Sequence, residues 1–113
     1  MQCYFHLEEI ERHGSAVRAV VSFTFDQGVV SKELIECKSI KFRKTALDLF
    51  LRFLKKYPEV YKRFDLEVCV DDWLLANYLN EKKVEIAVDL GRQIPFSTSY
   101  VHPKDNVAAK PLA

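Results

Sequence analysis

The chain has 113 residues, of which 49% are hydrophobic and 29% charged, and 17 basic against 16 acidic residues leave a formal net charge of +1. This length and composition exclude a disordered chain and suffice for one buried core, so we predict a single domain over residues 1–113. Because the net charge is so small, binding to nucleic acid would require a local basic patch.

The cysteine pattern and the apolar runs predict a soluble protein of the reducing cytoplasm. Cys3, Cys37 and Cys69 are odd in number, far apart and set among apolar residues, which favours buried thiols over disulfides or a metal site. No apolar run approaches the roughly 20 residues of a membrane span. The N-terminal sequence MQCYFHLEE lacks the basic and then apolar order of a secretory signal, so we expect no membrane partner.

The first part of the chain has the two-residue period of β-strands. Residues 2–10 and 17–25 alternate apolar and polar side chains, and residues 12–15 between them have turn chemistry. A second tight turn is expected at residues 26–28. Residues 29–42 are rich in valine, isoleucine and phenylalanine and predict a third strand, although residues 31–37 are also compatible with a helix. The pattern indicates a three-stranded antiparallel meander.

The second part alternates between helical and strand periods. Apolar side chains at helical spacing predict a helix over residues 44–57, which ends at Pro58. Residues 66–70 form an alternating strand, and Asp71 and Asp72 precede a short apolar helix whose first N–H groups a carboxylate can cap. Further strands are expected at residues 84–90 and 94–101. The fold class is therefore α/β, or α+β, with a sheet that continues beyond the meander through a helical crossover.

Three segments resemble the ribonuclease H family, and in particular its retroelement-type domains. The helix KTALDLFLRFLKKY places Asp48 where the family has a glutamate in an apolar helix, and the strand LEVCVDDWLL is similar to the family strand that ends in threonine and aspartate. The tail YVHPKDNVAAKPLA is similar to a family ending in which a Lys-Asp-Asn or Lys-Glu-Asn turn opens a segment with alanine, aspartate and leucine. The segments lie within residues 40–113, in the family's order.

The resemblance implies a ribonuclease H-like fold and a nuclease site that depends on divalent metal ions. Such a site needs carboxylates from separate strands and a helix to hold two ions about 4 Å apart, where they activate water and stabilise the leaving oxygen. Mg²⁺ and Mn²⁺ prefer oxygen ligands. By position, Asp71 matches best, Asp48 would replace the helical glutamate and Glu8 the first-strand aspartate, while His102 would lie near the family's mobile histidine.

Departures from the family pattern indicate a reduced or lost site rather than an intact one. The first strand lacks the family's aspartate, and Lys110 lies where the tail motif has its last aspartate, so its ammonium group would compete with a metal ion. The candidates also have ordinary structural explanations: a helix ion pair between Asp48 and Arg52, helix capping by Asp71 or Asp72, a solvated edge charge for Glu8 and a turn position for His102.

Two functions fit these observations. The first is a ribonuclease H-like domain, catalytically reduced or inactive, that contacts an RNA/DNA hybrid, a duplex or a nucleic-acid-processing partner. It would use the basic residues that bracket the first helix, namely Lys41, Arg43, Lys44, Lys55 and Lys56, unless these form only a solvated surface. The second is a protein–protein interaction module, such as an inhibitor, adaptor or immunity-type protein, because near-neutral charge and an extensively apolar helix suit binding by surface complementarity.

Overall fold

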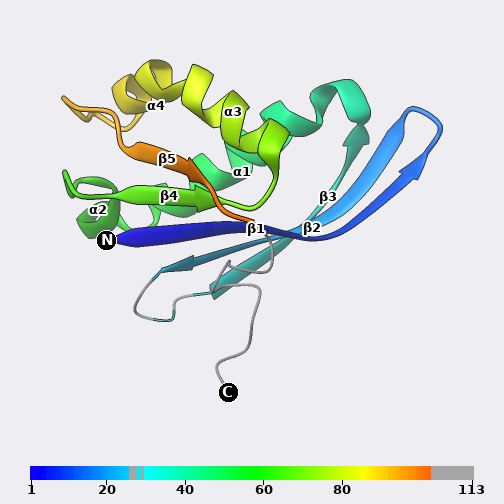
Figure 1. Ribbon diagram of the computed structural model, residues 1–113, viewed down its shortest axis with the longest axis horizontal. Helices are drawn as coiled ribbons and strands as arrows, with labels where there is room; N and C mark the ends of the chain where they lie inside the picture. Colours follow the sequence, from blue (N-terminus) through cyan, green and yellow to red (C-terminus); the bar gives the residue numbers. More distant parts are fainter. Residues whose placement is uncertain (26–27, 29, 103–113) are drawn as a thin grey trace.

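A computed structural model describes residues 1–25, 28 and 30–102 of the chain. In chain order, these residues form the strands β1 (Gln2–His13), β2 (Ala16–Phe25) and β3 (Val30–Lys38), the 3-10 turn η1 (Ser39–Lys41), the helices α1 (Phe42–Lys55) and α2 (Pro58–Tyr61), the strand β4 (Glu67–Val70), the helices α3 (Trp73–Glu81) and α4 (Lys83–Asp89), and the strand β5 (Ser97–Tyr100) (Figure 1). The mixed α/β class and the initial meander are confirmed. Within the described residues, no helix combines the length and the apolar character that crossing a membrane requires.

The strands form one mixed sheet in the order β3-β2-β1-β4-β5. β1 pairs antiparallel with β2 and β2 with β3, whereas β4 pairs parallel with β1 and β5 pairs parallel with β4. Parallel neighbours require a crossover, which α1 and α2 supply before β4, and α3 and α4 supply before β5. The carboxyl end of β4 therefore lies beside Phe5 of the longer strand β1, and β4 separates β5 from β1.

One face of the sheet packs against the helices. Phe5 of β1 and Phe23 of β2 point toward α1, and their ring centroids lie 5.4 and 5.6 Å from that of Phe50. Phe53 stacks on Phe23 at 4.8 Å. Leu79 of α3 and Ile86 of α4 belong to the same buried cluster, so these helices share one face of the sheet (Figure 1). The aromatic rings of strands and helix together form the centre of the core.

The structure corrects the prediction of a strand at residues 84–90, which form most of α4. The helix buries the adjacent residues Ile86 and Ala87, which a strand would point to opposite faces. Gly91 has a φ of 69°, and the N–H of Arg92 donates to the carbonyl of Ala87 at 2.8 Å, as in a Schellman cap. The glycine that was expected to end a strand therefore ends a helix.

The remaining boundaries differ less from the prediction. β3 is extended over its full length, so the helical alternative for residues 31–37 is wrong. α1 begins at Phe42, two residues before the predicted start at residue 44. Residues 26–27 of the second predicted turn, and residues 103–113 of the tail that carries the family resemblance, lie outside the described residues.

Phe23 offers a test of the core. Replacing Phe23 with alanine removes its ring contacts and leaves a cavity, so we expect the free energy of unfolding to fall by about 3–5 kcal/mol. Urea unfolding followed by circular dichroism measures this change. Ile40→Ala is the matched control, because Ile40 is 86% exposed, and it should alter stability by no more than about 0.5 kcal/mol. Equal losses in the two variants would contradict the central place of Phe23.

Candidate functional site

The polar face of the sheet is the one turned away from the helical core. The register places Tyr4 opposite Thr24 and His6 opposite Ser22, and directly opposed residues share a face of an antiparallel pair. None of the helices within the described residues packs on this face (Figure 1). Polar side chains that could bind a ligand or take part in catalysis therefore lie on this face and at the ends of the strands.

Asp71 lies where β4 ends, beside the middle of β1. Its N–H donates to the carbonyl of Phe5 at 3.3 Å and so extends the parallel pairing by one step. Its Oδ1 accepts the N–H of Leu7 at 3.0 Å, and its Oδ2 contacts Nδ1 of His6. The side chain is only 2% exposed. Both carboxylate oxygens thus join β4 to β1.

Asp72, the neighbouring carboxylate, is the cap of α3. Its Oδ2 accepts the N–H of Leu75 at 2.9 Å, which satisfies one of the free donors in the first turn of the helix. The capping interpretation is therefore confirmed for Asp72. Asp71 has different partners and does not cap the helix, so the two adjacent aspartates have different structural roles.

The other predicted metal ligands lie apart from Asp71. Glu8 is the extra residue of a bulge in β1, and its carboxylate pairs with Nζ of Lys32 at 3.1 Å. Asp48 is exposed on α1 and pairs with Lys44 at 3.6 Å, rather than with Arg52 as the sequence suggested. His102 follows β5 and is exposed. The structure therefore does not bring Glu8, Asp48 and Asp71 together.

The described residues do not fit the two-metal site that the family resemblance implies. Nowhere in residues 1–25, 28 and 30–102 do three histidine, cysteine, aspartate or glutamate side chains gather as metal ligands. Asp71, the best match by position, is almost completely buried. Mg²⁺ usually keeps several of its waters and needs open access to carboxylate oxygens, which this burial does not allow.

An exposed aromatic surface lies beside these carboxylates. Trp73 begins α3 and Tyr100 ends β5, and their rings meet edge to face with centroids 5.4 Å apart. Leu74 is exposed next to them. β5 stands at the edge of the sheet, because β4 is its neighbour on one side and no described strand lies on the other. We refer to Trp73, Leu74 and Tyr100 as the aromatic edge; no sequence pattern pointed to it, because its residues come from two distant segments.

The predicted basic patch is partly neutralised by its own surroundings. Lys55 pairs with Asp89 of α4 at 3.0 Å, and Lys44 with Asp48 as described above. The guanidinium of Arg43 lies 5.6 Å from the ring centroid of Tyr78. Lys41 and Lys56 are exposed. Exposed ion pairs of this kind contribute little energy, but they reduce the positive field that would attract phosphate.

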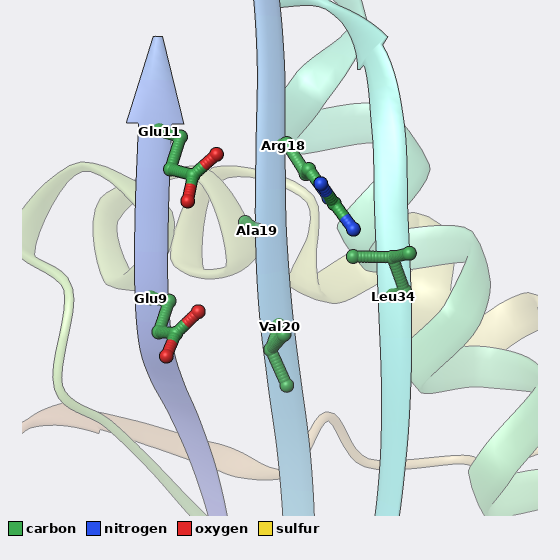
Figure 2. Close-up of a pocket in the computed structure, with 6 residues that line it drawn as sticks. All are labelled: Glu9, Glu11, Arg18, Ala19, Val20 and Leu34. Carbon is green, nitrogen blue, oxygen red and sulfur yellow. The ribbon is translucent and has the colours of Figure 1, made fainter.

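A shallow hollow of about 150 Å³ lies on the polar face near the β1–β2 hairpin. Glu9 and Glu11 of β1 point into it from one side, with Arg18 and Leu34 on the other (Figure 2). Arg18 pairs with Glu36 at 3.5 Å. Charges of both signs in water offer no arrangement that would activate a nucleophile or concentrate one kind of ligand.

In comparisons with known proteins, no family model, no curated protein and no solved structure matches this chain. The geometry of the chain's own residues is therefore what bears on its function.

The contacts of Asp71 lead to a stability prediction. Asp71→Ala leaves the N–H of Leu7 and the ring nitrogen of His6 without their partner, and each unsatisfied buried group costs about 1–3 kcal/mol. We expect a total loss of about 2 kcal/mol or more in the free energy of unfolding, measured by urea titration at neutral pH. Asp48→Ala is the control and should change stability by about 0.5 kcal/mol at most. Equal effects in the two variants would contradict the structural role of Asp71.

Proposed function

We propose that this chain is a catalytically reduced ribonuclease H-like domain that acts by binding a protein partner and not by cleaving nucleic acid. One observation carries the proposal. Asp71 lies at the strand end where the resemblance expects a metal ligand, yet it is buried and holds His6 and the Leu7 N–H. A carboxylate in this state stabilises the sheet and leaves no surface for a hydrated ion.

The order of elements supports the kinship with the ribonuclease H family. An antiparallel meander is followed by the apolar helix α1, by a strand that runs into Asp71, and by the short helix α3. This is the order that the resemblance implies. A fold can persist while the chemistry of its site is lost, so kinship of this kind is compatible with a binding role.

The side chains around Asp71 support the loss of nuclease chemistry. A two-metal mechanism needs several carboxylates to converge on the reacting phosphate. Here the side chain of β1 that contacts the Asp71 carboxylate is that of His6, while Glu8 and Asp48 are paired with lysines. Each of the three candidate ligands thus has a side-chain partner within the chain, His6 for Asp71 and a lysine for Glu8 and for Asp48.

The aromatic edge favours a protein as the partner. Tryptophan and tyrosine are enriched at protein interfaces, where they bury large areas and supply most of the binding energy. Trp73 and Leu74 are about 60% exposed (59% and 61%), and such neighbouring apolar side chains mark interaction sites. Two aspartates, Asp71 and Asp72, directly precede Trp73, and they supply none of the positive charge that phosphate binding needs.

The absence of nuclease chemistry is directly testable. Adding millimolar Mn²⁺ or Mg²⁺ should leave the melting temperature of the protein unchanged, because an ion that does not bind the native state does not stabilise it. Incubation with an RNA/DNA hybrid and Mn²⁺ should produce no cleavage above that of Asp71→Asn. Metal-dependent cleavage by the natural sequence that is lost in Asp71→Asn would overturn the proposal.

The binding role is tested by comparing proteins captured by the natural sequence, Trp73→Ser and Ile40→Ser. A genuine partner should be retained by Ile40→Ser and lost with Trp73→Ser, and the purified partner should bind Trp73→Ser at least about tenfold more weakly. A partner held equally by all three would contradict the role of the aromatic edge. Steeply salt-dependent binding of an RNA/DNA hybrid, weakened by Lys56→Glu, would identify nucleic acid as the partner instead.

A further inference from the structure

A second surface lies at the amino ends of β4 and β5, whereas the aromatic edge lies at their carboxyl ends. It is a groove of about 340 Å³ between the segment that enters β4 and the segment that joins α4 to β5. We call it the basic groove, and it is lined by Lys62, Phe64, Gly91, Arg92, Gln93 and Ile94. Its volume is at the lower end of the range of about 300–1,000 Å³ found for ligand sites. It can accommodate one or two side chains.

The charge of the groove is positive and fixed in place. The guanidinium of Arg92 donates from Nη1 to the carbonyls of Tyr61 and Arg63, the latter at 2.6 Å, and from Nε to the carbonyl of Ile94 at 2.9 Å. These acceptors orient the group but carry no full negative charge. Burial lowers the pKa of Arg92, yet an arginine remains protonated at neutral pH. The cation is therefore held ready for an anion.

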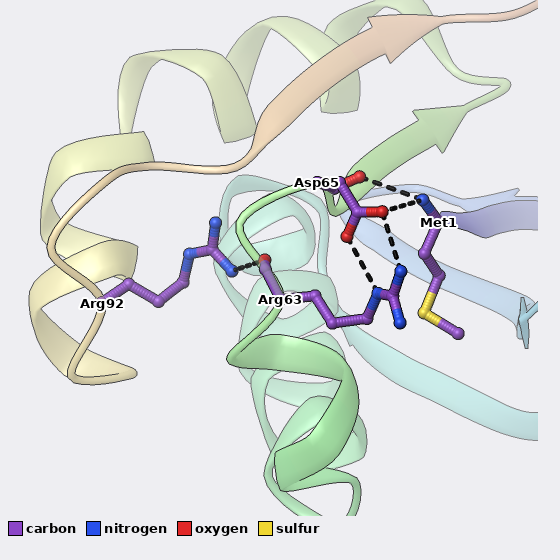
Figure 3. Close-up of polar contacts among 4 residues, drawn as sticks. All are labelled: Met1, Arg63, Asp65 and Arg92. Carbon is purple, nitrogen blue, oxygen red and sulfur yellow. Dashed lines mark hydrogen bonds and ion pairs between the residues drawn. The ribbon is translucent and has the colours of Figure 1, made fainter.

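The nearby carboxylate of Asp65 does not neutralise the groove. It accepts hydrogen bonds from Nε and Nη2 of Arg63, both at 2.8 Å, and lies 3.3 Å from the ammonium group of Met1 (Figure 3). The hydrogen bonds from Arg63 are the main cause of the lowered pKa of Asp65. Within the part of the chain that the structure describes, neither Lys62 nor Arg92 forms an ion pair with a carboxylate.

The sides of the groove are apolar. Phe64 is 86% exposed and Ile94 is 64% exposed, although both are large hydrophobic residues. An inorganic phosphate or a nucleic acid backbone would use only the two cations and leave these side chains in water. A ligand that carries an anionic group next to a large apolar group would use both features.

We propose that the basic groove binds a peptide segment of a partner protein in which an acidic side chain lies beside a large apolar one. The carboxylate would meet Arg92 and Lys62, and the apolar side chain would pack between Phe64 and Ile94. Charge complementarity sets the class of ligand, and the carbonyls that hold Arg92 reduce the cost of ordering it on binding.

The test uses the full chain labelled with ¹⁵N and an acetylated peptide in which two glutamates flank leucine and phenylalanine. We expect chemical-shift changes confined to the lining residues of the basic groove. Two matched peptides separate the contribution of the negative charge from that of the apolar side chains. One has glutamines in place of the glutamates, and the other has serines in place of leucine and phenylalanine. Each should bind at least about fivefold more weakly, since a desolvated charge or an apolar anchor typically contributes more than 1 kcal/mol.

Variants of the protein complete the test. Phe64→Ser and Lys62→Glu change exposed side chains, so the fold should persist, and each should weaken binding of the peptide about tenfold. Ile40→Ser removes an equally exposed apolar side chain elsewhere and should have no effect. The proposal would be overturned if millimolar peptide caused no chemical-shift changes in the protein, or if Phe64→Ser left those changes unaltered. A phosphate or oligonucleotide that binds the groove as tightly as the peptide would do so as well.

This inference is independent of the role proposed for the aromatic edge. Trp73 and Tyr100 lie at the carboxyl ends of β4 and β5, whereas the basic groove lies at their amino ends. Trp73→Ser should therefore leave binding of the acidic peptide unchanged. Loss of peptide binding in Phe64→Ser but not in Trp73→Ser supports the groove whether or not the proposed function holds.

Discussion

The carboxylate of Asp71 joins the two parts of the sheet. The meander β1–β3 is continuous, but β4 joins it through a short parallel pairing that extends from Gln2 opposite Glu67 to Phe5 opposite Val70. Parallel pairing is slightly less stable per residue than antiparallel pairing. Where this pairing ends, Asp71 accepts the N–H of Leu7 and contacts His6. β5 enters the sheet only through β4, so its position depends on the same junction.

These contacts also determine whether the carboxylate at the end of β4 is open to metal ions. A buried carboxylate is stable when its oxygens accept hydrogen bonds or face a complementary group, and Asp71 satisfies this condition through β1. A nuclease requires the opposite state, in which several carboxylates remain open to ions and their waters. The carboxylate at the end of β4 therefore serves the sheet here, whereas the side chains that follow it, Trp73 and Leu74, are exposed to solvent.

Local patterns predicted local structure well and distant contacts poorly. The two-residue period identified β1, β2 and β4, and an aspartate before an apolar run identified the cap of α3, because both signals depend on neighbouring residues. The same period misassigned α4, where Gly91 as a helix cap was the better signal. The contact between His6 and Asp71 joins residues 65 positions apart. It depends on strand order, which no short pattern contains.

The net charge of +1 conceals a separation of charge along the sheet. At the carboxyl end of β4 lie Asp71 and Asp72, and at its amino end lie Lys62 and Arg92 of the basic groove. A strand of this length spans about 13 Å, which exceeds the Debye length of about 8 Å at physiological ionic strength. The charges at one end of the strand are therefore largely screened from those at the other. A net charge near zero is therefore compatible with a locally positive groove at the amino ends of β4 and β5.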